Sequence, residues 1–168
     1  MKKVIAIFLT LVTSVFLCSC IDNDLRIAQE KFEEILDAIQ SENKDELTSL
    51  FSDDSLNKAQ AFDAAAEELF EYFEGVVESY DYVGPFVETT KENNQVVQIM
   101  EFSCEVKTTK CEYRIAFQYI IRDTENADRV GVQSLYVIKA KDDINLEYAY
   151  WGDSRFLPGI NIAIQNAE

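Results

Sequence analysis

The residues best suited to chemistry in this 168-residue chain are four cysteines, which fall into two pairs. Cys18 and Cys20 follow an apolar run near the start, whereas Cys104 and Cys111 lie seven positions apart in the second half. Histidine is absent, so the chain cannot form Ser-His-Asp or Cys-His catalytic arrangements or a histidine-ligated metal site. The second pair is also too small for a four-cysteine zinc site. We therefore expect no metal and no cofactor.

The first cysteine pair completes a pattern that is typical of a lipoprotein signal peptide. Two lysines precede an apolar run over residues 4–17, and a small residue, Ser19, stands before Cys20, as at a secretory cleavage site. With Leu17 three positions before Cys20, the segment resembles a lipobox, which predicts cleavage before Cys20 and palmitate-type lipid on its thiol. The alternatives are an ordinary signal peptide with chance cysteines and an uncleaved anchor.

This pattern divides the chain into a signal peptide over 1–19, a lipidated Cys20 with a short tether over 20–24, and one domain over 25–168. More than one buried acyl chain is needed for stable anchoring. Lipidated Cys20 would then hold the protein in the lipid bilayer, on the extracytoplasmic face of a bacterial cell membrane. The formal charge is −16, and loss of the two leader lysines makes it −18. Such an acidic surface repels phosphate backbones, so we expect no nucleic-acid partner.

The second cysteine pair lies in a predicted β-hairpin whose strands cover residues 96–106 and 111–122. If Lys107 and Thr108 form its loop, Cys104 and Cys111 face each other and form a disulfide, as is common in exported proteins. A loop of this size would stabilise the fold by about 2–3 kcal/mol in the chain-entropy model. The alternative is two buried free thiols.

An acidic loop over residues 123–128 carries four oxygen-bearing side chains, a type of ligand that calcium prefers. The spacing and central glycine of an EF-hand are missing. Acidic loops in acidic proteins are usually solvated turns with Asx caps. We therefore predict no metal site in this loop.

A candidate pocket is predicted where the last expected strand, over residues 144–151, ends. Tyr150, Trp151, Asp153 and Arg155 lie there, and aromatic rings with a few polar groups are typical of small-molecule pockets. The alternative is that the aromatic residues belong to the core and to cross-strand pairs. Pairs of carboxylates arise by chance in so acidic a chain, and we predict no catalytic residues.

The elements that must position these residues form helices first and strands afterwards, which is an α+β pattern. About three amphipathic helices are expected to pack on one face of a curved, mainly antiparallel sheet. The helices are expected over residues 25–40, 44–50 and 54–73. Strands are expected over 76–83, 86–90, 96–106, 111–122, 130–140 and 144–151, with a turn at Gly84-Pro85.

Several stretches of the chain resemble a family of small bacterial lipoproteins of unknown function, the DUF5104 family. That resemblance implies an NTF2-like (cystatin-like) fold, in which the helices and the curved sheet enclose a cone, and it implies no activity. The stretches that carry the resemblance are residues 31–39, 45–52, 112–115, 123–132, 134–138 and 158–160.

Three functions remain open at this stage. The first is a membrane-anchored module that binds a small molecule or a protein outside the cell. The second is an immunity-type or scaffold protein that acts through its acidic surface, because charge complementarity favours basic partners. The third is a hydrolase or isomerase that uses a pocket carboxylate. NTF2-like folds support binding and catalysis alike, so enzymatic activity stays undecided, with binding favoured.

Overall fold

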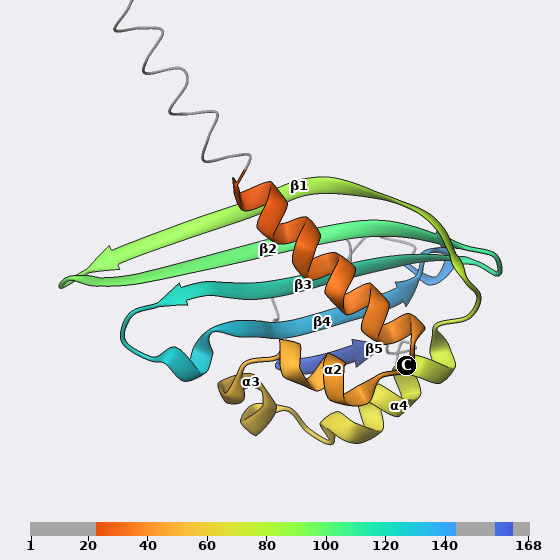
Figure 1. The fold of residues 1–168 in the computed structure, drawn as a ribbon, viewed down its shortest axis with the longest axis horizontal. Helices are drawn as coiled ribbons and strands as arrows, with labels where there is room; N and C mark the ends of the chain where they lie inside the picture. Colours follow the sequence, from red (N-terminus) through yellow and green to blue (C-terminus); the bar gives the residue numbers. More distant parts are fainter. Residues whose placement is uncertain (1–22, 144–156, 163–168) are drawn as a thin grey trace, which may run out of the picture.

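The computed structural model describes residues 23–143 and 157–162. Within them, a sheet of five strands in the order β1-β2-β3-β4-β5 carries the N-terminal helix on one face, and three shorter helices lie beside its β4–β5 end (Figure 1). The first four strands pair antiparallel, and β4 pairs with β5 in parallel. The α+β class and the mainly antiparallel sheet are therefore confirmed. The strands are β1 (Val77–Glu92), β2 (Gln95–Thr108), β3 (Glu112–Asp123), β4 (Gly131–Lys139) and β5 (Gly159–Ile162).

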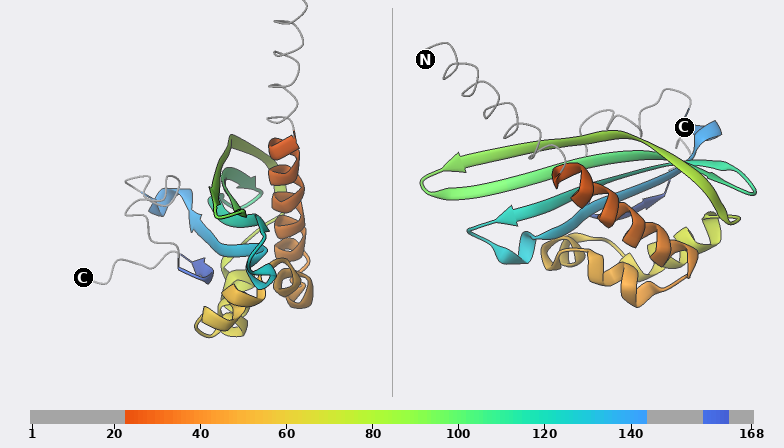
Figure 2. Two further views of the ribbon diagram at one scale, coloured as in Figure 1. Left: turned by 90° about the vertical axis from the view of Figure 1, so that its left-hand side faces the viewer. Right: turned by 45° about the horizontal axis from the view of Figure 1, so that its top comes forward.

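The N-terminal helix, described over residues 23–40, crosses the sheet diagonally (Figure 2). Its predicted apolar face is confirmed, because Phe32 and Ile35 are fully buried and Ile39 is nearly so. The ring of Phe32 packs against aromatic rings of β1 and β2. The helix ends where Glu42 adopts a positive φ of 51°, a left-handed turn that is common just beyond helix C-termini.

Three short helices cluster beside the β4–β5 end of the sheet: α2 (Lys44–Leu50), α3 (Asp53–Lys58) and α4 (Phe62–Tyr72). The expected single helix over 54–73 is thus wrong, because the chain breaks at Ala61, which has a φ of +51°. The break lets Gly159 of β5 approach the chain between the two helices. A Cβ at Gly159 would lie only 2.7 Å from that of Ala59.

One long strand, β1, replaces the two strands expected on either side of Gly84-Pro85. The pairing with β2 shifts between Val83 and Phe86 and then continues, so this segment is a bulge instead of a turn. Proline is tolerated at such a position because β1 lies at an edge of the described sheet, where a missing N–H leaves no second strand unpaired.

The β2–β3 hairpin was predicted correctly, but its register separates the two cysteines. Cys104 lies opposite Ile115, whereas the backbone N–H of Thr108 donates to the carbonyl of Cys111. The loop is therefore Thr109-Lys110, and the cysteines are offset by four positions, about 13 Å along the strand. Disulfides need Cα atoms within about 7 Å. Both cysteines are free thiols, so the prediction of a disulfide between Cys104 and Cys111 is wrong.

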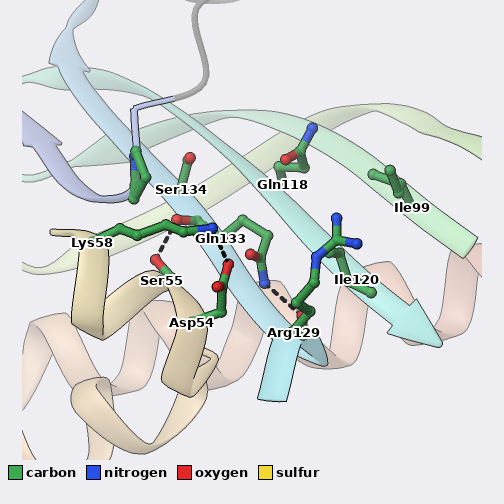
Figure 3. A pocket seen from close by; sticks show the side chains of 10 residues that line it. Asp54, Ser55, Lys58, Ile99, Gln118, Ile120, Arg129, Gln133 and Ser134 are labelled. Carbon is green, nitrogen blue, oxygen red and sulfur yellow. Dashed lines mark hydrogen bonds and ion pairs between the residues drawn. The ribbon is translucent and has the colours of Figure 1, made fainter. Parts of the chain in front are cut away.

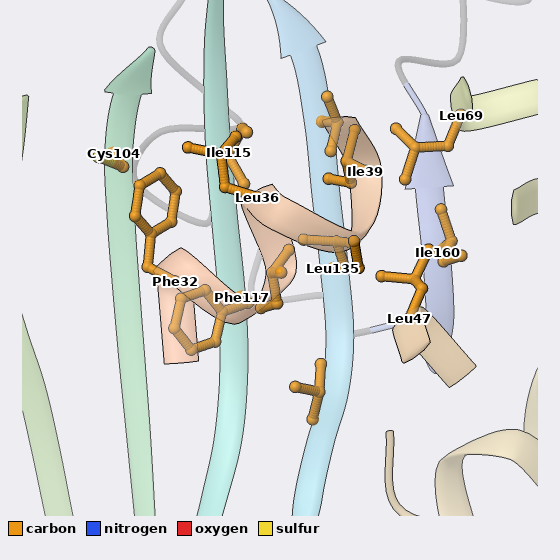
Figure 4. Packing of buried hydrophobic residues seen from close by; sticks show 14 of the residues in the cluster. Phe32, Leu36, Ile39, Leu47, Leu69, Cys104, Ile115, Phe117, Leu135 and Ile160 are labelled. Carbon is orange, nitrogen blue, oxygen red and sulfur yellow. The ribbon is translucent and has the colours of Figure 1, made fainter. Parts of the chain in front are cut away.

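The apolar core fills the space between the helices and the sheet (Figure 4). Buried side chains of the N-terminal helix, α2 and α4 meet buried residues of β2, β3, β4 and β5. The Tyr113 hydroxyl, deep in this layer, accepts from the Glu74 N–H and donates to the Tyr72 carbonyl, which ties the end of α4 to β3. No helix in the described segments is both long and apolar enough to cross a membrane.

Candidate ligand-binding site

The pocket predicted at Tyr150, Trp151, Asp153 and Arg155 lies outside the described residues, as does Cys20. The strand expected over 144–151 lies outside them as well. Within the described residues, the helix-facing side of the sheet is occupied by packed apolar side chains. A cavity formed by described residues must therefore lie on another surface of the molecule.

A cavity of about 230 Å³ lies on the opposite side of the sheet, next to α3. We call it the polar cavity, because most of its lining side chains are polar or charged (Figure 3). Five come from strands β2, β3 and β4, and the remainder come from α3, the turn before β4 and the residue just before β5. The lining residues are Asp54, Ser55, Lys58, Ile99, Gln118, Ile120, Arg129, Gln133, Ser134 and Pro158.

The α3 wall is fixed to the sheet by serine hydroxyls. Ser52 caps α3 by accepting from the Ser55 N–H at 3.0 Å, and its own N–H donates to the Val132 carbonyl of β4. Ser55 donates its hydroxyl to the Gln133 carbonyl at 2.6 Å and accepts from the Gly159 N–H at 3.2 Å. The first turn of α3 is therefore hydrogen-bonded to both β4 and β5, which holds this wall against the sheet.

Gln133 connects the α3 wall to the turn before β4. Its side-chain amide donates to the Ser52 hydroxyl at 2.8 Å and to the Arg129 carbonyl at 2.7 Å. Gly131, with a φ of +132°, lets the backbone pass this point, because a Cβ there would lie 2.8 Å from the Ser52 nitrogen. The hydrogen bond from Gln133 therefore holds the backbone of Arg129 beside the α3 wall.

The guanidinium of Arg129 is oriented by a carboxylate behind it. Its Nη1 lies 2.9 Å from Oδ2 of Asp123, whose side chain is almost fully buried. The other oxygen of Asp123 accepts from the N–H groups of Asn126 and Glu125. These backbone hydrogen bonds, followed by the charge of Arg129, hold the pKa of Asp123 below its usual value. Asn126 caps the following turn in the same way, so the loop is an Asx-capped turn.

The floor of the cavity is formed by the sheet. Ser134 is almost completely buried, yet its hydroxyl makes no side-chain hydrogen bond within the described part of the chain. The Gln118 amide donates only a long 3.4 Å bond to Glu101, whose pKa is raised by burial. Ile99 and Ile120 add an apolar patch. The floor therefore offers a hydroxyl and an amide beside a small apolar surface.

A second hollow of about 190 Å³ lies between β1, β2 and β3 on the same face. Its one arginine, Arg114, is already paired, at 3.2 Å with Glu105 and at 3.1 Å with Asp143. Arg114 also donates to the backbone carbonyl of Asp143. Because these partners occupy its guanidinium, the hollow offers fewer free donors than the polar cavity.

The lining side chains of the polar cavity offer hydrogen-bonding and charged groups, and none of them pairs a hydroxyl with a base. The Ser55 hydroxyl is engaged by backbone groups, and no lining side chain stands as a base beside Ser134. Among the described residues, no three His, Cys, Asp or Glu side chains gather closely enough to hold a metal ion. What the cavity provides is two cations, one carboxylate, two amides and hydroxyls on a fixed frame.

Sequence reasoning did not find this cavity, because its lining comes from residues spread over more than a hundred positions of the chain. One signal was present: the acidic loop was noticed as a possible calcium site. The same Asp123 that drew attention there is the group that orients Arg129.

Comparison with known proteins gave one family match. A family model described as a domain of unknown function (DUF5104) matches residues 34–140. A comparison with curated proteins gave no significant match. The matched range includes α3, the Asp123 loop and β4, and therefore almost all of the polar cavity.

Proposed function

The chain belongs to the DUF5104 family, and from that premise we propose that it is a lipid-anchored, extracytoplasmic binding module. Its ligand is a small polar molecule that occupies the polar cavity. The observation that carries the proposal is a cavity of about 230 Å³ whose floor has two polar side chains, Ser134 and Gln118, that lack a short side-chain hydrogen bond in the described part of the chain. Binding sites combine a few well-placed polar groups with apolar surface in this way.

The anchor and the finer fold belong to the same proposal. The lipobox-like segment before Cys20 supports lipidation in a bacterial membrane, and the high negative charge argues against electrostatic attachment to anionic lipid. The order of helices and antiparallel strands supports an NTF2-like cone, whose interior is packed with apolar side chains over the described residues.

A second candidate is an immunity-type or scaffold protein that acts through its surface. One observation favours it: β1 lies at an edge of the described sheet, and Phe86 on that strand is 63% exposed. Exposed edge strands can pair with another chain. Acidic residues on the same strand, Glu88 and Glu92, weaken the attraction for an acidic or apolar partner.

The third function, catalysis by a pocket carboxylate, has less support. Glu101 is the carboxyl group among the described residues whose pKa burial raises, and it does not line either described cavity. The proposal therefore remains a binding function.

Binding can be tested with the full mature protein in detergent and four probes, each observed by ligand-detected NMR. The probes are L-alanine, succinate, ethylamine and D-glucose, which represent a zwitterion, a dianion, a cation and a neutral polyol. We expect at least one probe to bind, and Ser134→Leu to abolish its binding by filling the cavity. Ser103→Leu is the matched control, because Ser103 lies on the same face of the sheet outside the cavity lining.

Thermal melting would establish that both variants are folded, with Gln118→Leu as a second cavity variant. Absence of binding by every probe would overturn the proposal. So would binding that survives both cavity variants.

A further inference from the structure

We propose that the polar cavity selects a small zwitterion of amino-acid type, with a carboxylate held by Arg129 and an ammonium held by Asp54. This inference rests on the proposed binding function and names the chemical class of the ligand. It follows from four properties of the cavity: an oriented guanidinium, an accessible carboxylate, a balance of charges and a limited volume.

The guanidinium of Arg129 is suited to a ligand carboxylate. Only one hydrogen bond from its five N–H donors goes to Asp123, and 39% of the side chain is exposed. Because Asp123 accepts from Nη1 alone, the donors on the other edges of the group stay available for a fork, the geometry that binds carboxylates with two parallel hydrogen bonds. In Figure 3 the Arg129 side chain reaches along the sheet toward Ile120.

Asp54 on α3 provides the complementary charge on another wall. Its carboxylate is paired with Lys58 at 2.7 Å, but the Lys58 side chain is 59% exposed. The Asp54 side chain itself is 23% exposed. Helical pairs one turn apart contribute about 0.3–0.5 kcal/mol when exposed, so a ligand ammonium can compete with the solvated Lys58 for this carboxylate. Figure 3 shows both side chains extending from α3 toward β4.

The charges around the cavity already balance. Arg129 and Lys58 are offset by Asp123 and Asp54, so a ligand with no net charge can enter without leaving an uncompensated charge behind. A dianion would lack a second free cation. It would also meet the repulsion of a chain with a formal charge of −16, which lowers the local concentration of anions.

Size and floor chemistry narrow the class of ligand further. The cavity, at about 230 Å³, is smaller than the roughly 300–1,000 Å³ of pockets for drug-sized ligands. Ser134 and Gln118 add neutral hydrogen-bonding groups to the lining. Ile99 and Ile120 offer surface for a short aliphatic side chain. A small amino acid matches this volume and carries both of the charges that the lining complements.

The test uses the full mature protein and the same four probes. We expect L-alanine to bind more tightly than succinate, ethylamine or D-glucose. Asp54→Asn and Arg129→Gln should each weaken L-alanine binding by about tenfold to a hundredfold, which is the range for charge-assisted hydrogen bonds. The matched controls Asp53→Asn and Arg122→Gln carry the same charge changes at exposed positions outside the lining and should leave binding unchanged.

Arg129→Gln removes the partner of buried Asp123, so its folding must be verified by thermal melting. Asp54→Asn leaves that ion pair intact and keeps the test decisive if the first variant unfolds. If D-glucose or succinate binds more tightly than L-alanine, and Ser134→Leu abolishes that binding, this inference is overturned and the proposed function is supported. If no probe binds, both the inference and the proposed function are overturned. If Asp54→Asn leaves L-alanine binding unchanged, only the inference is overturned.

Discussion

At the scale of single residues, Asp123 combines two tasks. Its Oδ1 accepts from two backbone N–H groups of its own loop, and its Oδ2 pairs with Arg129. The first task shapes the turn, and the second orients the cation of the polar cavity. A structural carboxylate therefore also prepares the cavity for binding.

Asp123 predicts a specific dependence of stability on pH. Its pKa is lowered in the folded state by hydrogen bonds to Asn126 and Glu125. Its contribution is therefore complete above the unfolded pKa, near 3.8, and is lost as the pH falls through the folded value. We expect Asp123→Asn to lower the urea midpoint clearly at pH 7 and by a smaller amount at pH 3, because part of the contribution of Asp123 is already lost below pH 3.8. An equal disadvantage at both pH values would contradict this assignment.

The two cysteines should differ in reactivity. Burial raises the pKa of the Cys104 thiol to about 12, so almost no thiolate forms at neutral pH, whereas Cys111 is partly exposed. We expect iodoacetamide to modify Cys111 in the native protein and Cys104 only after unfolding. Peptide mapping by mass spectrometry without reductant measures both. If neither residue reacts even after unfolding, the two free thiols are contradicted and the disulfide between Cys104 and Cys111 is supported.

At the scale of elements, periodicity in the sequence identified most helices and strands. The N-terminal helix, α2 and β4 match their expected ranges closely, because each has a regular apolar pattern and polar boundaries. The break at Ala61 was missed because no glycine or proline marks it. The continuity of β1 was missed because Gly84-Pro85 normally signals a turn, and β5 was missed because a four-residue parallel strand depends on distant partners.

The left-handed conformation of Ala61 gives an element-scale prediction. A non-glycine residue with φ near +51° carries a strain of roughly 1–2 kcal/mol. Glycine removes this strain, but it also raises the conformational entropy of the unfolded chain, which offsets part of the gain in stability. We expect Ala61→Gly to stabilise the protein by about 0.5–1 kcal/mol in urea unfolding. The control Ala64→Gly, at an exposed position inside α4, should destabilise by a similar amount. Equal losses from both substitutions would contradict the broken-helix description.

At the scale of the whole molecule, the packed layer and the candidate binding layer are separate. The helices and the sheet bury the apolar core on one face, and the polar cavity lies on the other. No pattern in the sequence could reveal the cavity, because it depends on the register of three strands and on α3 docking beside β4. The family match, over residues 34–140, covers most of this arrangement and leaves out β5.

The proposed anchor is also a whole-molecule property. Cells grown with a clickable palmitate analogue should label the wild-type protein. Cys20→Ala should remove the label, because this thiol is the proposed attachment point. The matched control Cys18→Ala changes the neighbouring cysteine and should keep the label. Persistent labelling of Cys20→Ala, or an unlabelled wild type, would refute lipidation at Cys20.

The central claim, that the polar cavity is a binding site, is tested most directly by mapping amide chemical shifts in the ¹⁵N-labelled mature protein. The protein would be titrated separately with L-alanine, succinate, ethylamine and D-glucose. The account predicts saturable shifts centred on Ser55, Gln118 and Ser134 with at least one probe, and most strongly with L-alanine. Shifts centred on the second hollow around Arg114, or no saturable shift with any probe, would contradict it.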